Sequence, residues 1–403
     1  MTRHGLLTLR LVARPSLHGV SREVGMNRIT RMGLVLVTVI ALLMAGRLLP
    51  TSISAGRIVR GASMHDRRAD HSSTLLPDGR VLIAGGMVEN GIFLNSAELY
   101  DPGKGGFVST ASMQSRRVGH SATLLPNGKV LLAGGLAGRI FEGGPGIVAT
   151  TETYDPAISQ FVAGPLMGAP RSGHAAVLLR NKKVLIVGGE DNNERPLATT
   201  EFYDPASNRF GAAAGMQVPR VAHSAVMLQD GRVLVTGGVN GRASALASAE
   251  IYDPSTGAWH AAGDMTSPRE KHAATLLPDG RVLITGGSAD GEWHPVRTAE
   301  LFDPRTNKFT AIDDMELARF KLPGATARLQ NGKVLVAGGA SEAEIYDGAT
   351  GKFSRAGCVG EPHYFATATL LKNGQVLITG GYGRSHGRSN GPVSSEQAWI
   401  YQP

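Results

Sequence analysis

The chain has 403 residues, one cysteine and a formal net charge of +8. A single cysteine excludes an internal disulfide framework and a four-cysteine zinc site, and a hydrophobic content of 42% excludes global disorder. The length exceeds that of one ordinary single-core domain, so we expect either two domains or one repetitive architecture.

The first segment, residues 1–55, has the features of an export signal. It carries seven arginines and one glutamate, which leaves only +2 for residues 56–403. The balance of +2 disfavours a nucleic-acid partner. An uncharged apolar run at residues 32–46 is shorter than the ~20 residues that span a bilayer, and small residues follow it, as in a signal peptide. We predict an exported protein with a cleaved signal peptide; the alternative is a membrane anchor at residues 32–49.

A glycine pair then recurs seven times along the chain. The pairs lie at 85–86, 134–135, 188–189, 237–238, 286–287, 338–339 and 380–381. Periods of this size are typical of propellers and solenoids. In the first repeat the sequence predicts strands at 71–76, 80–84, 97–100 and from about 107 to 113, and a Pro-Asp-Gly turn joins the first two strands. Four short strands per repeat correspond to one propeller blade.

The two ends of the repeat region complement each other. Residues 398–403 align with a third strand, so the last repeat lacks its fourth strand. Residues 58–64 align with the fourth strand at 107–113 but have no repeat of their own. Pairing the two segments closes the ring and hides both sheet edges. We therefore predict an all-β, seven-bladed propeller over residues 56–403, as one domain and as a monomer.

The repeats resemble kelch repeats. The resemblance rests on the glycine pairs, on Tyr-Asp-Pro segments at Tyr100, Tyr154, Tyr203 and Tyr252, and on an aromatic residue about seven positions after each of these tyrosines. It covers nearly all of residues 56–403. Kelch propellers include ubiquitin-ligase adaptors, sialic acid mutarotases and copper radical oxidases such as galactose and glyoxal oxidase. The resemblance therefore implies the fold and leaves the function open.

The loop between the second and third strands varies most in length. It is long in blade 2 (residues 136–151) and blade 7 (382–395) and short in blade 6 (340–343). Function usually lies on irregular loops held by a regular scaffold, so we predict that this face binds the ligand, with a notch at blade 6. Aromatic and basic loop residues are candidate contacts; they are Phe141, Trp293, Tyr382 and Arg384.

An Arg-x-x-His motif opens the first strand of most blades. The arginines are Arg68, Arg117, Arg171, Arg220 and Arg269, with Arg319 in blade 6, and the histidines are His71, His120, His174, His223 and His272. These residues should ring one mouth of the central channel. The guanidinium groups suit carboxylates and sugar acids, and the kelch resemblance implies contacts with acidic ligands here. The alternative is a scaffold role, which identical repetition favours for the histidines, with each arginine paired to a third-strand glutamate.

A copper oxidase would need further ligands. In the copper radical oxidases a tyrosine directly precedes the ligand histidine, whereas the residues here are Asp70, Gly119, Gly173, Ala222 and Lys271. The only cysteine, Cys358, aligns with a methionine of other blades, and we predict a packed core residue there. We therefore predict no metal and no other cofactor. The favoured function is a binding module for carbohydrate or an extracellular protein segment; the alternative is a sugar-directed enzyme, either a galactose or glyoxal oxidase-like oxidoreductase or a mutarotase.

Overall fold

The computed structural model describes residues 56–138, 146–241, 245–291, 294–384 and 392–403. The candidate contact residues Phe141 and Trp293 lie outside these ranges. Residues 55–403 form one compact unit. The described part of the chain consists of β-strands and a single 3-10 turn, η1 (Glu89–Gly91), and it contains no helix that is long and apolar enough to cross a membrane.

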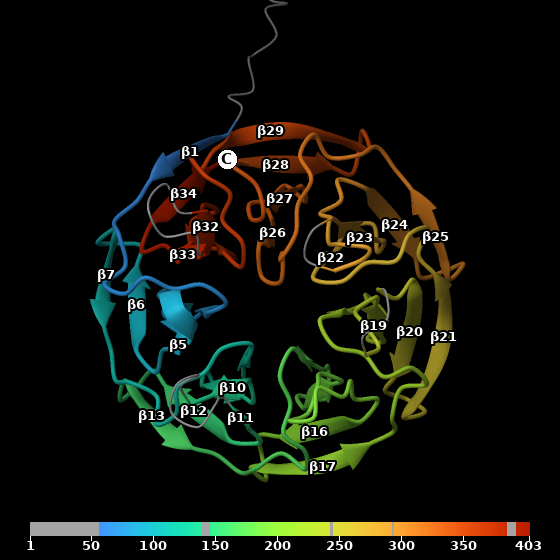
Figure 1. Cartoon of the computed structure of the whole chain (residues 1–403), viewed down its shortest axis with the longest axis horizontal. Helices are drawn as coiled ribbons and strands as arrows, with labels where there is room; N and C mark the ends of the chain where they lie inside the picture. The colour runs from blue at the N-terminus through green and yellow to red at the C-terminus, as the bar shows by residue number, and fades with distance from the viewer. Residues whose placement is uncertain (1–55, 139–145, 242–244, 292–293, 385–391) are drawn as a thin grey trace, which may run out of the picture. The chain divides into compact units, whose positions relative to one another are not determined.

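Seven four-stranded antiparallel sheets stand around a central axis as the blades of a propeller (Figure 1). Blades 1 to 3 are formed by β2 (Ser72–Leu75), β3 (Val81–Ala84), β6 (Ala97–Asp101) and β7 (Gly106–Ser109); by β8 (Ser121–Leu124), β9 (Val130–Ala133), β12 (Thr151–Asp155) and β13 (Gln160–Ala163); and by β14 (Ala175–Leu178), β15 (Val184–Val187), β16 (Thr200–Asp204) and β17 (Arg209–Ala213). Blades 4 and 5 are formed by β18 (Ser224–Met227), β19 (Val233–Thr236), β20 (Ser248–Asp253) and β21 (Ala258–Asp264), and by β22 (Ala273–Leu276), β23 (Val282–Thr285), β24 (Ala299–Asp303) and β25 (Lys308–Ala311). Blades 6 and 7 are formed by β26 (Thr326–Arg328), β27 (Val334–Val336), β28 (Glu342–Asp347) and β29 (Lys352–Cys358), and by β30 (Thr367–Leu370), β31 (Val376–Thr379), β34 (Ala398–Gln402) and β1 (Arg57–Arg60).

The two faces of the ring differ. Three short ribbons project from one of them, which we call the loop face: β4 (Met87–Val88) with β5 (Ile92–Phe93), β10 (Leu136–Ala137) with β11 (Gly146–Ile147), and β32 (Tyr382–Arg384) with β33 (Pro392–Ser394). Blade 6 has only residues 337–341 between β27 and β28. The opposite face carries the short hairpin turns, and we call it the turn face.

The N-terminal strand closes the ring. Strand β1 pairs with β34, so that Ile58 faces Tyr401 in the same way that Phe107 faces Tyr100 in blade 1. The first strands of neighbouring blades contact one another around the whole ring, including β2 with β30. The prediction of an all-β, seven-bladed propeller closed by an N-terminal strand is confirmed.

The hydrophobic core lies between neighbouring blades. Second strands such as β3 are buried along their whole length, which explains why they read as unbroken apolar runs rather than as an alternating pattern. One cluster joins Leu82 and Leu99 of blade 1 to Val130 and Tyr154 of blade 2. Each blade can therefore bury its surface only against the next, and the sheets depend on closure of the ring for stability.

Each glycine pair packs directly against the first-strand segment of the following blade, and we call this contact the socket. A Cβ on Gly237 (φ +60°) would lie 2.3 Å from the main-chain oxygen of Arg269 and 2.8 Å from the ring of His272. The main-chain N–H of Gly238 donates a hydrogen bond of 2.9 Å to the same oxygen. The pair thus lets the Arg-x-x-His segment of blade 5 approach blade 4 closely.

Replacing Gly237 with alanine should lower the free energy of unfolding by about 2 kcal/mol, because a Cβ adds backbone strain and overlaps the oxygen of Arg269. Urea denaturation measures the change. Gly211→Ala is the matched control, since its Cβ would meet no atom within 4 Å. Equal effects at the two positions would contradict the socket role.

Candidate functional site

The six arginines of the repeated motif are buried, each with 0% exposure. Every guanidinium pairs with the third-strand glutamate of its own blade at 2.6–3.0 Å. The pairs are Arg68–Glu98, Arg117–Glu152, Arg171–Glu201, Arg220–Glu250, Arg269–Glu300 and Arg319–Glu344. The expectation that these arginines contact a ligand is therefore corrected, because the guanidinium groups have no exposed surface.

The remaining hydrogen bonds of each arginine–glutamate pair connect the blade to the link that enters it. Arg220 also donates to the main-chain oxygens of Gly237 and Ser248. The carboxylate of Glu250 accepts the main-chain N–H groups of Gln217 and Val218, which lie in the link from blade 3. A buried charge pair is tolerated only when its hydrogen bonds are satisfied in this way, so each pair acts as a clamp between a blade and the link that enters it.

The motif histidines also join neighbouring blades. A ring nitrogen of four of them lies within hydrogen-bonding distance of a hydroxyl on the preceding blade: His71 and Thr379 (2.9 Å), His120 and Ser72 (3.1 Å), His174 and Ser121 (2.9 Å), and His272 and Thr236 (2.8 Å). Burial lowers the pKa of His120, His174 and His223 to about 3, with a further contribution from the adjacent arginine. These neutral, packed rings support the scaffold interpretation of the histidines.

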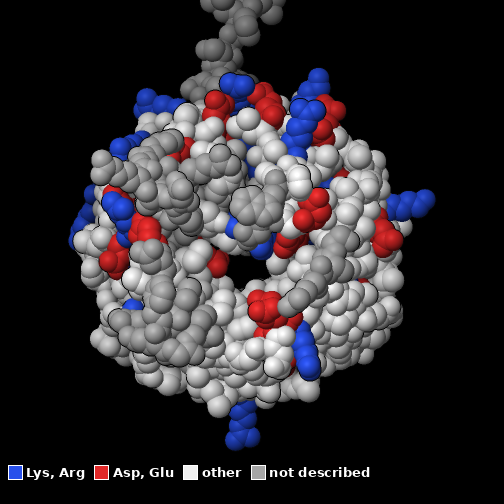
Figure 2. Space-filling view, viewed as in Figure 1, with Lys and Arg blue, Asp and Glu red and all other residues white. Residues whose placement is uncertain are grey.

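The residue directly before each first strand's motif histidine, and its equivalent in blades 6 and 7, takes a left-handed conformation. These residues are Asp70, Gly119, Gly173, Ala222, Lys271, Lys321 and Phe365, with φ between +49° and +63°. We call them the mouth ring. Six of them stand two residues before an axial strand on the loop face, and Lys321 stands five residues before β26. Figure 2 shows acidic and basic side chains bordering the central opening.

Hydrogen bonds connect the mouth ring into a continuous belt. Six main-chain N–H groups donate to the neighbouring blade: Gly173 to Gly119 (3.2 Å), Ala222 to Gly173 (3.0 Å), Lys271 to Ala222 (2.9 Å), Leu322 to Lys271 (3.0 Å), Phe365 to Lys321 (3.0 Å) and Asp70 to Phe365 (3.2 Å). The seventh link is made by a side chain, since the N–H of Gly119 bonds the carboxylate of Asp70. The belt holds seven side-chain positions in fixed places around the mouth.

The identity of the residue at these positions changes around the ring. Blades 2, 3 and 4 contribute Gly119, Gly173 and Ala222, which carry at most a methyl group. Blades 5, 6, 7 and 1 contribute two lysines, a phenylalanine and an aspartate. One side of the mouth, which we call the small-residue side, therefore carries no charged or aromatic group at these positions, while the other side gathers them.

Lys321 is the centre of the charged and aromatic side. Its Nζ lies 5.3, 5.4 and 5.1 Å from the ring centroids of Phe320, Phe365 and Tyr382 and donates a hydrogen bond to the Tyr382 hydroxyl. The Nζ of Lys271 lies 5.3 Å from the Phe320 ring centroid. Contacts of the ammonium group with three aromatic faces hold it in place.

Asp70 stands beside these cations. Burial raises its pKa to about 7, although Lys271 and Lys321 each act to lower it. Burial also raises the pKa of Glu190, whose main chain bridges Ser172 in the link between blades 2 and 3. The mouth therefore holds a carboxyl group that can gain or lose a proton near neutral pH.

The two candidate loop residues within the described ranges, Tyr382 and Arg384, lie in different surroundings. The structure brings Tyr382 into the Lys321 cluster. Arg384 lies in ribbon strand β32, where its main chain pairs with Pro392. Within the described ranges, no group of three or more His, Cys, Asp or Glu side chains is placed to hold a metal ion.

The prediction for Cys358 is wrong, because its side chain is exposed. Val359 follows Phe353 by six residues, as Met265 follows Trp259, so Val359 and not Cys358 is the equivalent of the methionine. Val359 takes the buried place, and its N–H bonds the oxygen of Ser341 as the N–H of Met265 bonds that of Ala247 in an earlier repeat.

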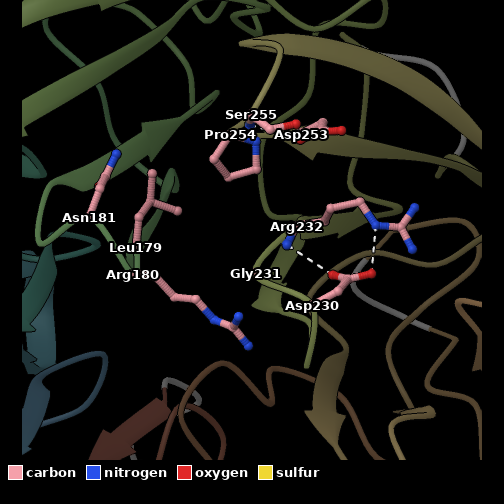
Figure 3. A pocket seen from close by; sticks show the side chains of 9 residues that line it. All are labelled: Leu179, Arg180, Asn181, Asp230, Gly231, Arg232, Asp253, Pro254 and Ser255. Carbon is pink, nitrogen blue, oxygen red and sulfur yellow. Dashed lines mark hydrogen bonds and ion pairs between the residues drawn. The ribbon is translucent and has the colours of Figure 1, made fainter.

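A hollow of about 500 Å³ on the turn face lies between the hairpins of blades 3 and 4 (Figure 3). Its charged groups are engaged with their neighbours: Arg232 pairs with Asp230 at 2.8 Å, and Arg180 donates to the main-chain oxygen of Gln229. Blades 1 and 5 repeat the first of these pairs as Arg80–Asp78 and Arg281–Asp279. The hollow therefore belongs to the repeated scaffold, in contrast to the mouth.

The mouth ring is not among the candidate sites that the sequence predicts. In the sequence its residues bear only on the absence of a copper-ligating tyrosine before the histidines. The available signal was variation, since this position of the repeated motif holds small, acidic and basic residues in turn. The arginines attracted attention because they repeat, which is the property of a scaffold.

Comparisons with known proteins agree with this architecture. Residues 149–339 match the model of the KLHDC2/KLHL20/DRC7 Kelch-repeats domain. Among solved structures, a novel fungal alcohol oxidase of the AA5 family in complex with copper superposes with a TM-score of 0.65 at 16% identity, over 86% of this chain and 75% of the other. The structure of YjhT superposes with a TM-score of 0.53 at 18% identity, over 61% of this chain and 84% of the other.

No curated protein matches the chain. At these identities the structural likeness shows the fold alone. The seven glycine pairs and the seven four-stranded sheets of the described residues identify the chain as a seven-bladed β-propeller, and its central repeats, residues 149–339, match a Kelch-repeats domain.

Proposed function

We propose that this protein is an exported binding module that holds an acidic carbohydrate or an extracellular protein segment at the loop-face mouth. The observation that carries the proposal is the asymmetry of the mouth ring. Scaffold requirements are the same in every blade, whereas the requirements of a ligand are not. Charged and aromatic residues gather at Asp70, Lys271, Lys321 and Phe365 on an otherwise repeated frame.

The chemistry of the cluster supports an acidic ligand. Ammonium groups form strong hydrogen bonds with carboxylates, and the faces of Phe365 and Tyr382 can cover the apolar side of a sugar ring. Kelch propellers generally act as binding scaffolds, which fits this use of the mouth.

Export is the second part of the proposal. The basic and apolar composition of residues 1–55 supports it, with the segment either removed or retained as an anchor. An exported propeller would meet glycans and extracellular proteins at its loop face. Fractionation of cells that express the full chain tests this part.

Lys321→Met should weaken the binding of glucuronate or N-acetylneuraminate about 10- to 100-fold, because the variant loses a charge-assisted hydrogen bond. Methionine keeps the length and the aromatic contacts of the lysine stem, so the fold should persist. Isothermal titration calorimetry measures the affinity, and thermal unfolding checks the fold. Arg305→Met is the matched control, because Arg305 lies in an exposed turn-face pair with Asp303. Unchanged affinity in folded Lys321→Met would refute the assignment of the mouth as the site.

A further inference from the structure

We infer that the mouth takes a carboxylate-bearing sugar whose carboxylate replaces that of Asp70 beside Lys271 and Lys321, so that Asp70 takes up a proton when the ligand binds. The inference rests on the proposed function and specifies its ligand class. It also assigns Asp70 as the residue that determines specificity between acidic and neutral sugars.

In the unliganded protein the Asp70 carboxylate occupies the place that we assign to the ligand carboxylate. The main-chain N–H of Asp70 donates a hydrogen bond to the main-chain oxygen of Phe365 on the aromatic side of the mouth, and its carboxylate accepts the N–H of Gly119 on the small-residue side. The Oδ2 atom lies 3.7 Å from the point where a Cβ on Gly119 would stand. The carboxylate therefore lies at the boundary between the small-residue side and the side that carries the lysines, in the place that we assign to the ligand carboxylate.

The charged groups around Asp70 determine how the site responds when a ligand carboxylate binds. Lys271 and Lys321 act on Asp70 electrostatically, and Lys271 also acts on Glu190 and lies 3.8 Å from Glu270. On the other sides of Asp70, His71 is held neutral by burial and Arg68 is paired with Glu98. No further cation is placed to serve a second carboxylate among the groups that the structure describes around Asp70.

Two carboxylates that share one site cannot both stay ionised at no cost. Burial already places the pKa of Asp70 at about 7, so Asp70 is the group that gives way. The ligand carboxylate pairs with the lysines, and a solvent proton converts the Asp70 carboxylate into a neutral carboxyl group. No bond other than this O–H is formed. The carbonyl oxygen of the neutral group can still accept the N–H of Gly119, so the belt stays intact.

Calorimetric titration of the full exported chain with sodium glucuronate tests the inference. Titrations at pH 8 in phosphate and in Tris, whose ionisation enthalpies differ, give the number of protons exchanged. We expect uptake of about one proton per glucuronate and about tenfold weaker binding for each pH unit above 7. Glucose, the neutral parent sugar, should bind at least tenfold more weakly and exchange no proton.

Asp70→Asn is the key variant, because an amide oxygen can still accept the Gly119 N–H while the competing charge is gone. It should bind glucuronate more tightly than wild type at pH 8, with no proton uptake and no pH dependence. Glu190→Gln is the matched control, since Glu190 also lies near Lys271. Its proton uptake should equal that of wild type.

The outcomes separate this inference from the proposed function. Binding of glucuronate without proton uptake, or equal uptake in Asp70→Asn, overturns the role of Asp70 and leaves the binding module standing. Failure of both glucuronate and N-acetylneuraminate to bind wild type overturns the acidic sugar itself. Binding of a peptide C-terminal carboxylate in their place, with proton uptake, overturns the assignment to sugars and retains Asp70.

Discussion

Replacing Arg220 with methionine is expected to lower the free energy of unfolding by about 3–5 kcal/mol, the usual cost of breaking a buried charge pair. The variant leaves the Glu250 carboxylate, whose side chain is 3% exposed, without its cation. It also removes the guanidinium donor of the main-chain oxygens of Gly237 and Ser248, of which the second keeps the N–H of Gly237. Chemical denaturation measures the loss.

Two comparisons make this result specific. Arg305→Met breaks a pair on the turn face in which the arginine side chain is 83% exposed, and it should change stability by no more than about 0.5 kcal/mol. The double variant Arg220→Met/Glu250→Met should lose less than the single variant, because no uncompensated charge remains. If Arg220→Met costs no more than Arg305→Met, the clamp role is refuted.

A steep loss of stability is expected as the pH falls from about 6.5 to 4. Six histidines are buried in a neutral state: His71, His120, His174, His223, His272 and His363. Burial lowers their pKa values to about 3 for three of them and to about 4 for His363, and well below the usual value for His71 and His272. The unfolded chain therefore binds more protons than the folded protein in this range.

The sign follows from proton linkage, because a state that binds extra protons gains population as the pH falls. Six such groups give a slope of at most about 8 kcal/mol per pH unit. Asp70 acts in the opposite direction between about pH 4 and 7, because its pKa is raised in the folded protein, and it removes at most one proton from the slope. Denaturation midpoints measured from pH 8 to 4 check the prediction. A flat profile between pH 7 and 5 would mean that the histidines are not buried neutral.

The sequence carries the fold in local signals. Glycine pairs, Asp-Gly turns and apolar runs each fix a short segment, and the spare strand at residues 58–64 indicates closure. The arginines are different, because their fate depends on a glutamate about 30 residues later that reaches them only after the blade has folded. Both the ligand and the scaffold interpretation were therefore open until the structure placed Arg68 and its equivalents inside the ring.

The mouth ring could not be predicted for a related reason. Glycine at 119 and 173 is compatible with a left-handed backbone, but Asp70, Lys271 and Phe365 adopt it only because the belt holds them there. The environment of Asp70 arises from Lys271 and Lys321, which lie about 200 residues or more away in sequence. Cys358 is a different case, because Val359 follows Phe353 at the same spacing of six residues as Met265 follows Trp259, so the buried position could have been found from the sequence.

The central claim is that the repeated residues hold the ring together, while the differing residues of the mouth ring bind the ligand. Hydrogen–deuterium exchange of the wild-type chain with and without saturating glucuronate tests it most directly. We predict slower exchange in residues 69–71, 320–322 and 364–366, with the turn face unchanged. Slower exchange around the turn-face hollow at Arg180 and Asp230, with no change in the mouth ring, would contradict the claim.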